Sequence, residues 1–195
     1  MNNLCGDSLI SEQDLFQSQS GGVTPTSPLQ FKIVEVNPYT ASEYNKKWHS
    51  RLPLIHPSNI TRNTYYVCYG ATFDNQCYAI AIWSSPVARA LATGLDKEKI
   101  IELRRMAISP KAPKNTASRM ISIMVKLINK KFPKITRFIS YQDTEVHKGT
   151  IYKASGWKIC GNTKGASWCK SRKRNKDQTT ANKIRWEITH RLEGV

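Results

Sequence analysis

The chain has 195 residues, of which 39% are hydrophobic and 23% charged, a composition typical of one globular domain rather than of a disordered or fibrous chain. No apolar run approaches the roughly 18 residues that a membrane-spanning helix needs. The first residues also lack the pattern of a signal peptide. We therefore expect a cytoplasmic protein that has no contact with a membrane.

The formal net charge is +16, from 30 Lys and Arg residues against 14 Asp and Glu. Residues 1–30 hold three acidic residues and no Lys or Arg, so the rest of the chain carries +19, three more than the whole. A field of this sign attracts polyanions, and phosphate contacts dominate binding to nucleic acids. The charge predicts a nucleic-acid partner. The competing interpretation is a basic protein that its charge keeps in solution.

The cysteines form an odd set without a C-x-x-C pair, and they are Cys5, Cys68, Cys77, Cys160 and Cys169. This spacing favours neither a disulfide framework nor a structural zinc site. Buried free thiols are the expectation for an intracellular protein. The alternative is a metal ion held by some of these cysteines together with His49 or His147.

Residues 1–28 are rich in Ser, Gln, Gly, Asn and Pro, which predicts a flexible polar leader before a single domain over residues 29–195. Alternation predicts a strand over residues 31–36. A short helix follows over residues 40–48, with Thr40 or Ser42 as its N-cap, and a loop over 49–57.

Residues 65–71 and 77–83 are predicted to form a hairpin whose turn is Asp74-Asn75, with a loop over 84–95 behind it. Residues 100–108 are a strand. An apolar stripe predicts a helix that Asn115 or Thr116 caps and that ends near Lys131. A strand over 135–140 then completes a parallel strand–helix–strand unit.

The last part of the chain is predicted as a helix over residues 143–154, a strand over 157–160, a basic loop over 161–180 and a strand over 183–188. The expected fold class is α/β (α+β). It has a mixed, mostly antiparallel central sheet with a strand–helix–strand parallel core and helices on both faces.

This order of elements resembles the N-acetyltransferase (GNAT) fold, and residues 101–159 carry the likeness. Residues 102–108 are similar to its central strand, before the loop and helix that hold the donor's pyrophosphate. Residues 152–157 resemble its Y-x-x-x-G-F motif, whose tyrosine often protonates the departing thiolate. The resemblance implies that Tyr152 is a general acid. The competing interpretation is an ordinary residue of an amphipathic helix.

The loop before the long helix departs from the family pattern Q/R-x-x-G-x-G/A, because residues 111–119 contain no glycine. Glycines let the backbone approach a pyrophosphate closely, so an altered donor, or another pose of coenzyme A, is an open alternative. Backbone N–H groups at the helix start and nearby basic side chains still suit phosphates. The predicted donor-binding residues are Arg104, Lys114, Asn115, Thr116, Ala117, Ser118 and Arg119.

A second resemblance, over residues 44–157, is to the DNA-modification family of phage Mu Mom. It rests on residues 48–53, 83–86, 102–105, 115–118, 140–143 and 149–152. That family converts the exocyclic amine of adenine in phage DNA to an N6-carbamoylmethyl group, which shields the DNA from restriction. The resemblance implies the same reaction here, double-stranded DNA as partner, an acyl-type donor and iron as a further requirement.

The resemblance singles out Tyr152, Asp143, Ser140 and Arg104, and the candidate catalytic residues are Tyr152, Asp143, Ser140 and His49. Asp143 would take a proton from the attacking amine, while its competing role is that of a helix N-cap. His49 would orient the base or bind metal, against the alternative of an ordinary surface residue in a loop.

The basic run within residues 170–176 is predicted to clamp phosphates, with a solvated loop as the alternative. Tyr141 and Trp168 would stack on a flipped adenine, because the amine is shielded in a stacked duplex. For Trp168 the alternative is core packing. The predicted nucleic-acid-binding residues are Tyr141, Trp168, Lys170, Arg172, Lys173, Arg174 and Lys176.

An acyl donor should leave an amide on the amine, yet the carbamoylmethyl group is attached through a CH2. Transfer of glycine reconciles the two, because the new free amine can displace the original nitrogen from the ring as a carboxamide. The donor would then be acetyl-CoA in the conventional scheme, or an activated glycine such as glycyl-tRNA in this one, with tRNA as a second partner.

Two other functions remain open from sequence. One is a conventional N-acetyltransferase that uses acetyl-CoA on a protein or small amine. The other is a non-catalytic DNA-binding protein that has kept the fold. The sequence also leaves a homodimer open.

Overall fold

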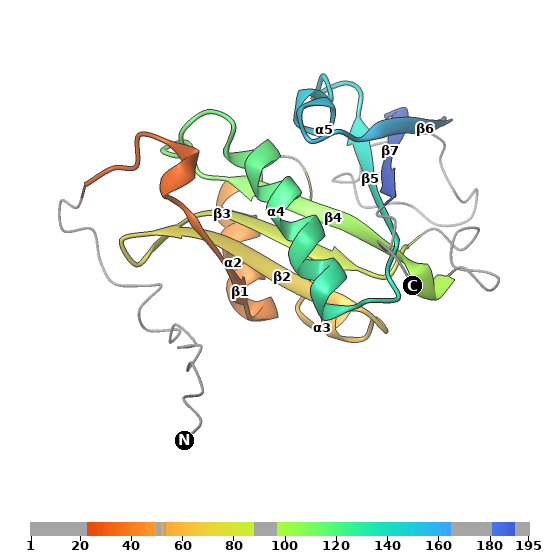
Figure 1. The fold of residues 1–195 in the computed structure, drawn as a ribbon, viewed down its shortest axis with the longest axis horizontal. Helices are drawn as coiled ribbons and strands as arrows, with labels where there is room; N and C mark the ends of the chain where they lie inside the picture. The colour runs from red at the N-terminus through yellow and green to blue at the C-terminus, as the bar shows by residue number, and fades with distance from the viewer. Residues whose placement is uncertain (1–22, 50–51, 53, 88–96, 165–180, 190–195) are drawn as a thin grey trace.

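The computed structural model describes residues 23–49, 52, 54–87, 97–164 and 181–189. These residues form one seven-stranded sheet in the order β1-β2-β3-β4-β5-β7-β6, which confirms the predicted mixed α/β architecture (Figure 1). In chain order the elements are η1 (Pro28–Gln30), β1 (Lys32–Val36), α2 (Pro38–Trp48), α3 (Ser58–Thr61), β2 (Tyr66–Phe73), β3 (Gln76–Ser84), η3 (Lys97–Lys99), β4 (Ile100–Ile108), α4 (Thr116–Lys131), β5 (Arg137–Asp143), α5 (Thr150–Ala154), β6 (Lys158–Thr163) and β7 (Lys183–Thr189).

The first four strands form an antiparallel meander, and its central hairpin follows from local chemistry. Asp74 and Asn75 join β2 to β3 with φ angles of 47° and 54°. Two consecutive residues with positive φ give the turn whose twist matches that of the flanking strands. The predicted hairpin and its turn residues are therefore confirmed.

Both faces of this meander are covered. Ala79, Ala81 and Trp83 of β3 belong to a core under α4, while Ile80 and Ile82 belong to a second core under α2. Figure 1 shows α4 on one side of β1–β4 and α2 on the other. A strand that is buried on both faces must be apolar throughout, which explains why β3 shows no alternation of polar residues.

Helix α4 joins β4 to β5, and these two strands are parallel. Its buried residues include Met120, Ile121, Met124 and Ile128, spaced as the predicted apolar stripe. The predicted strand–helix–strand unit is confirmed.

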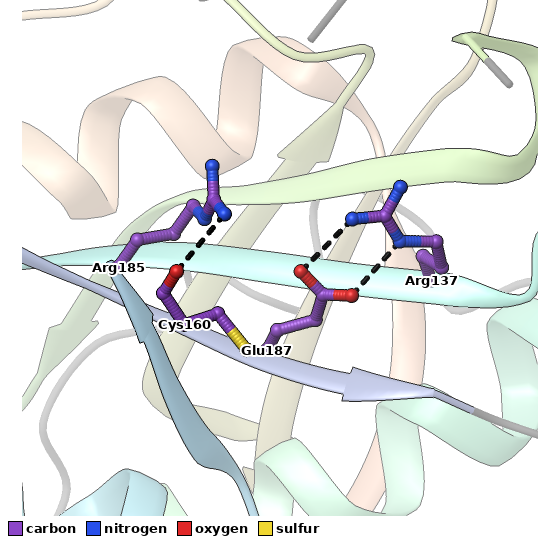
Figure 2. Close-up of polar contacts among 4 residues, drawn as sticks. All are labelled: Arg137, Cys160, Arg185 and Glu187. Carbon is purple, nitrogen blue, oxygen red and sulfur yellow. Dashed lines mark hydrogen bonds and ion pairs between the residues drawn. The ribbon is translucent and has the colours of Figure 1, made fainter.

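The end of the sheet that comes last in the chain is built from β5, β7 and β6, all antiparallel to one another where they pair. Figure 2 shows the Glu187 carboxylate between these strands, accepting from Arg137 Nε at 2.8 Å and from Arg137 Nη2 at 3.1 Å. The neighbouring Arg185 donates from Nη2 to the carbonyl of Cys160 at 3.1 Å. Cys160 is the extra residue of a bulge in β6, so Arg185 restores a partner to a carbonyl that the bulge displaces from the ladder.

The largest difference from the predicted elements lies at residues 143–154, which do not form one helix. Asp143 ends β5, where it pairs with Lys183 of β7, and only Thr150–Ala154 are helical. Gly149 has φ +71° and starts the helix from a left-handed conformation. The pairing with β7 competes with a helix here, and that partner is distant in sequence.

Smaller differences concern element ends. Helix α2 begins at Pro38, and its cap is Asn37, whose Oδ1 accepts from Thr40 N at 2.8 Å, so neither Thr40 nor Ser42 is the N-cap. The strand predicted over 135–140 runs over Arg137–Asp143. Residues 1–22 of the predicted leader and residues 165–180 of the predicted basic loop lie outside the described residues, whereas residues 161–163 belong to β6.

None of the helices formed by the described residues has the length and apolar character needed to cross a lipid bilayer.

Candidate active site

The candidate site lies where β4 and β5 stop pairing. Their parallel ladder ends at Leu103 and Ser140, yet β4 continues to Ile108 and β5 to Asp143. Arg104 is an extra residue in β4, because Ile82 of β3 faces Arg105 and Trp83 faces Leu103. Figure 1 shows β5 turning away from β4 beyond this bulge. The separation leaves backbone groups of both strands free of each other, which suits an extended ligand.

A cavity of about 270 Å³ occupies this separation. The residues that line it are His49, Leu52, Leu103, Arg104, Arg105, Met106, Ile108, Ala117, Ser140, Tyr141, Gln142, Asp143, Val146, His147, Gly149, Ile151 and Tyr152. All four candidate catalytic residues are among them, although they come from α2, β5 and α5 and span more than a hundred positions of the sequence.

One side of the cavity, the tyrosine wall, consists of Tyr152, Ser140 and Leu103. The hydroxyls of Tyr152 and Ser140 lie 2.8 Å apart, and Ser140 Oγ donates to the Leu103 carbonyl at 3.1 Å. A serine hydroxyl has one hydrogen. With that hydrogen on Leu103, the phenol of Tyr152 is the donor to Ser140. Before a substrate binds, the wall therefore holds a proton on Tyr152, and this proton points to Ser140 Oγ.

Burial decides the charge of this tyrosine. Tyr152 is only 8% exposed, and its ring stacks on Trp186 with centroids 5.4 Å apart. Burial raises the pKa of Tyr152 above its ordinary value, against a smaller lowering by the hydrogen bond with Ser140. The side chain is thus a neutral phenol at neutral pH and is suited to give a proton to a leaving group rather than to remove one.

The position of Tyr152 depends on the turn before α5. The Gln142 side chain donates to the His147 carbonyl, and its Oε1 accepts from Trp186 Nε1 at 2.7 Å. A Cβ at Gly149 would lie 2.5 Å from Gln142 Oε1 and 2.6 Å from Trp186 Cζ2. Only glycine fits there, so the glycine and the amide together fix where α5 begins.

The opposite side of the cavity, the arginine wall, consists of Arg105, His49 and His147. Arg105 faces Ile82 across the β3–β4 ladder, which places it on the α2 face of the sheet, away from Leu103. Arg105 Nη1 donates to the Arg104 carbonyl at 2.8 Å, but its Nε is shielded from solvent and has no hydrogen-bond partner among the described residues. His49 Nδ1 is likewise buried, and no described residue bonds it.

The charges on this wall follow from burial. Burial and then Arg104 lower the pKa of Arg105 to about 10, so its guanidinium is charged at neutral pH. Burial, together with Arg105 and His147, lowers the pKa of His49, which favours the neutral imidazole. An unpaired buried donor lowers stability by about 1–3 kcal/mol. A ligand that bonds these atoms would therefore be favoured on this wall.

Asp143 and Tyr141 of β5 also line the cavity. Asp143 Oδ1 accepts from Glu145 N at 3.0 Å and so caps a turn; the alternative role of helix N-cap is wrong, because Gly149 holds that place. Tyr141 is partly buried, and its hydroxyl bonds to the side chain of Arg185. Both residues line the cavity, as their predicted roles require.

Glu102 is a buried carboxylate beside the site that the sequence analysis did not single out. It is 8% exposed and accepts from Val87 N at 3.0 Å, while Arg104 and Arg105 lie near it. Burial raises the pKa of Glu102. Its position between the apolar residues Ile101 and Leu103 was the available signal, since a buried Glu is rare unless it is paired. Arg105 and Gln142 were not predicted as site residues either, and His147 was predicted only as an alternative metal ligand.

The predicted donor loop lies at the start of α4. Asn115 occupies the N-cap position with φ +66° and makes no capping hydrogen bond with its side chain, and Lys114 is exposed. Among these loop residues Ala117 lines the cavity. Thr116 is buried and bonds to the Pro113 carbonyl, and Arg119 Nη1 reaches the Phe31 carbonyl at 3.4 Å. Arg104 also bonds on the α2 side, to Asn59 O and Ser84 Oγ.

The remaining predicted nucleic-acid contacts, at Trp168, Lys170, Arg172, Lys173, Arg174 and Lys176, lie outside the described residues. Within the described part of the chain, no three His, Cys, Asp or Glu side chains gather closely enough to hold a metal ion. His49, Asp143 and His147 share the cavity without forming such a group. The described residues therefore do not fit an iron site.

Comparison with solved structures shows the N-acetyltransferase fold. The ribosomal-protein-S18-alanine N-acetyltransferase from Escherichia coli is 11% identical with a TM-score of 0.58, and the match covers 84% of this chain and 96% of that one. An N-acetyltransferase from Staphylococcus aureus is 10% identical with a TM-score of 0.59 over 82% and 97% of the two chains. An acetyltransferase from Bacillus subtilis in complex with CoA is 12% identical with a TM-score of 0.53 over 82% and 98%.

No curated protein sequence matches the chain. The model of the Mom protein family, in contrast, matches residues 31–193, which contain every described element after η1 and the whole of the cavity. The chain belongs to the Mom protein family.

Proposed function

We propose that the chain modifies DNA by acyl transfer to the exocyclic amine of adenine, leading to N6-carbamoylmethyladenine and protection from restriction. The observation that carries this proposal is the buried Tyr152–Ser140 pair at the place where β4 and β5 separate. The family and the basic chain support a nucleic-acid substrate.

In the first step the amine nitrogen attacks the carbonyl carbon of the donor, and a C–N bond forms. Asp143 takes a proton from the amine. The bond from the carbonyl carbon to the leaving sulfur or oxygen breaks, and Tyr152 gives its proton to that atom. Ser140 holds the phenol oxygen in place through the 2.8 Å contact, and the O–H turns from Ser140 Oγ to the leaving atom for this transfer.

The product favours an activated glycine as the donor, such as glycyl-tRNA. After glycine is transferred, its free amine attacks the ring carbon that carries the modified nitrogen. The bond from that carbon to the original nitrogen breaks, and this nitrogen leaves as the carboxamide. The rearrangement is an isomerisation, so it needs no oxidant or reductant.

An acyl-CoA thioester is the alternative donor. The Bacillus subtilis acetyltransferase was solved with CoA, which supports a thioester in this fold. The loop of this chain offers phosphates the exposed Lys111 and Lys114 but no glycine. That arrangement suits a polyanionic carrier at least as well as a closely bound pyrophosphate.

Mass spectrometry of nucleosides from plasmid DNA co-expressed with the protein tests the proposal. We expect a new adenosine derivative that is absent with Tyr152→Phe and with Asp143→Ala, both checked for folding by circular dichroism. Cells fed glycine labelled with ¹³C and ¹⁵N should place both labels in the derivative. Unlabelled product would exclude glycine as the donor. Unmodified DNA from cells that contain folded wild-type protein would contradict the proposed function, and acetyl-CoA binding would then favour a conventional N-acetyltransferase.

A further inference from the structure

The two unpaired nitrogen atoms of the arginine wall belong to side chains that line the same cavity. Arg105 Nε and His49 Nδ1 are both shielded from solvent and lack a hydrogen-bond partner within the part of the chain that the structure describes. They come from different elements, β4 and the residue that caps the end of α2. Buried polar atoms in folded proteins are almost always paired. Two exceptions on one wall point to a ligand that completes it.

The described residues around Arg105 and His49 do not supply that partner. The Arg105 guanidinium already uses Nη1 on the Arg104 carbonyl. Glu102, whose charge acts on Arg105, accepts the backbone N–H of Val87 on Oε2. Asp143 directs Oδ1 to the turn at Glu145. The Arg105 Nε–H therefore remains available to an acceptor atom that enters the cavity.

The rest of the lining indicates what enters. Leu52, Met106 and Val146 are apolar, and Tyr141 presents an aromatic ring. His49 is held neutral by burial. Such a lining offers a flat apolar body a place to pack and offers its edge a few directed hydrogen bonds, which is the pattern of a site for a flipped base. The apolar and aromatic lining of the cavity favours a base over a phosphate at this place.

We propose that the arginine wall is the acceptor-base site, in which the Arg105 Nε–H donates a hydrogen bond to a ring nitrogen of an extrahelical adenine beside His49. This inference rests on the proposed function, since it names the part of the cavity that holds the acceptor. The tyrosine wall is then left for the donor. Arg105 is a specificity-determining residue, because the atom it reads is present in the purine ring and absent from the DNA backbone.

The test measures dissociation constants for short duplexes that carry one adenine opposite an abasic site. Matched duplexes replace this adenine with 1-deaza-, 3-deaza- or 7-deazaadenine, or with a second abasic site. Wild-type protein should lose about tenfold in affinity when one of the three ring nitrogens becomes CH. Arg105→Lys keeps the charge but has no Nε–H, and it should show the same loss with adenine and almost none further with that deaza base.

The matched control is Arg62→Lys, since Arg62 is exposed and its Nε bonds only the Ser58 carbonyl of its own helix. It should behave as wild type on every duplex. Equal wild-type affinity for adenine, all three deaza bases and the abasic duplex would overturn the inference. The inference would also be overturned if Arg105→Lys lowered the affinity for the doubly abasic duplex by the same factor as the affinity for the adenine duplex. Arg105 would then contact phosphate.

The deaza series on wild-type protein needs no variant, so it decides the inference even where Arg105→Lys unfolds. The inference and the proposed function also fail separately. Modified plasmid DNA together with a flat deaza series would overturn the acceptor-base site alone. Unmodified plasmid DNA with a selective deaza effect would contradict the reaction and leave the base site in place.

Discussion

The two walls of the cavity differ in how their polar groups are paired. On the tyrosine wall the polar groups form hydrogen bonds with one another, because Tyr152 bonds Ser140 and Ser140 bonds the Leu103 carbonyl. On the arginine wall Arg105 Nε and His49 Nδ1 have no partner. Groups that already bond each other are fixed before a substrate arrives, and this fixed geometry is what a proton transfer needs. Unpaired groups favour a bound ligand over an empty site. The contrast assigns chemistry to the first wall and recognition to the second.

Replacing Tyr152 on the tyrosine wall should have the largest effect on kcat. Tyr152→Phe removes the proton donor and keeps the ring that stacks on Trp186. We expect kcat to fall about 100-fold to 1,000-fold, within the usual contribution of a general acid, while the Kd for DNA stays unchanged. Quantifying modified adenosine per minute in a purified reaction measures this. A kcat within threefold of wild type would contradict the assigned role.

A substitution at Gly149 should shift the start of α5 and with it Tyr152 of the tyrosine wall. Gly149→Ala places a methyl group against Gln142 and Trp186 at a positive φ, and we expect the free energy of unfolding to fall by about 3 kcal/mol. Gly156→Ala is the matched control, because φ is +77° there but nothing lies within 4 Å of the new Cβ. It should cost about 1 kcal/mol. Urea denaturation measures both, and equal losses would show that the contacts at Gly149 are unimportant.

Removing the serine of the pair should have a smaller effect. Ser140→Ala leaves the Leu103 carbonyl and the Tyr152 hydroxyl without their partner, and we expect a loss of about 1–2 kcal/mol in stability and about tenfold in kcat. Ser122→Ala serves as control, because this exposed hydroxyl bonds only the Ser118 carbonyl of its own helix. In the Tyr152→Phe background Ser140→Ala should add almost nothing to the loss of kcat. Additive losses would mean that the two hydroxyls act independently.

The smallest expected effect is that of pH on kcat and on DNA selectivity. Because burial raises the pKa of Tyr152 above 10.0, the phenol stays protonated through pH 9, and kcat should not decline on the alkaline side before that. Because burial lowers the pKa of His49 below its ordinary value of 6.5, its ring gains a proton only at a lower pH than an exposed histidine does, and DNA selectivity should stay constant through neutral pH and weaken only in acid. A loss of kcat between pH 7 and 9 would contradict the protonated phenol.

The sequence predicts much of the fold because its signals are local. The positive φ angles of Asp74 and Asn75 and the buried stripe of α4 follow from short stretches of residues. The helix predicted over 143–154 is wrong because its first residue pairs with Lys183, forty positions away. No pattern within the stretch itself indicates that partner.

The candidate site divides in the same way. Tyr152, Ser140 and Asp143 were predicted from motifs, and the structure places them on one cavity. Arg105 was missed because simple alternation along β4 puts it on the same face as Leu103. The extra residue Arg104 shifts the register and turns Arg105 to the face of Ile82. A one-residue bulge leaves no mark in the sequence, so the arginine wall becomes visible only in three dimensions.

The division of labour between the walls is tested most directly by measuring kcat and the DNA dissociation constant for Tyr152→Phe and Arg105→Lys side by side, on the duplex with one adenine opposite an abasic site. The account predicts that Tyr152→Phe lowers kcat with the dissociation constant unchanged, and that Arg105→Lys raises the dissociation constant about tenfold. If instead Tyr152→Phe weakens DNA binding, or Arg105→Lys leaves it unchanged, the two walls do not have these separate roles.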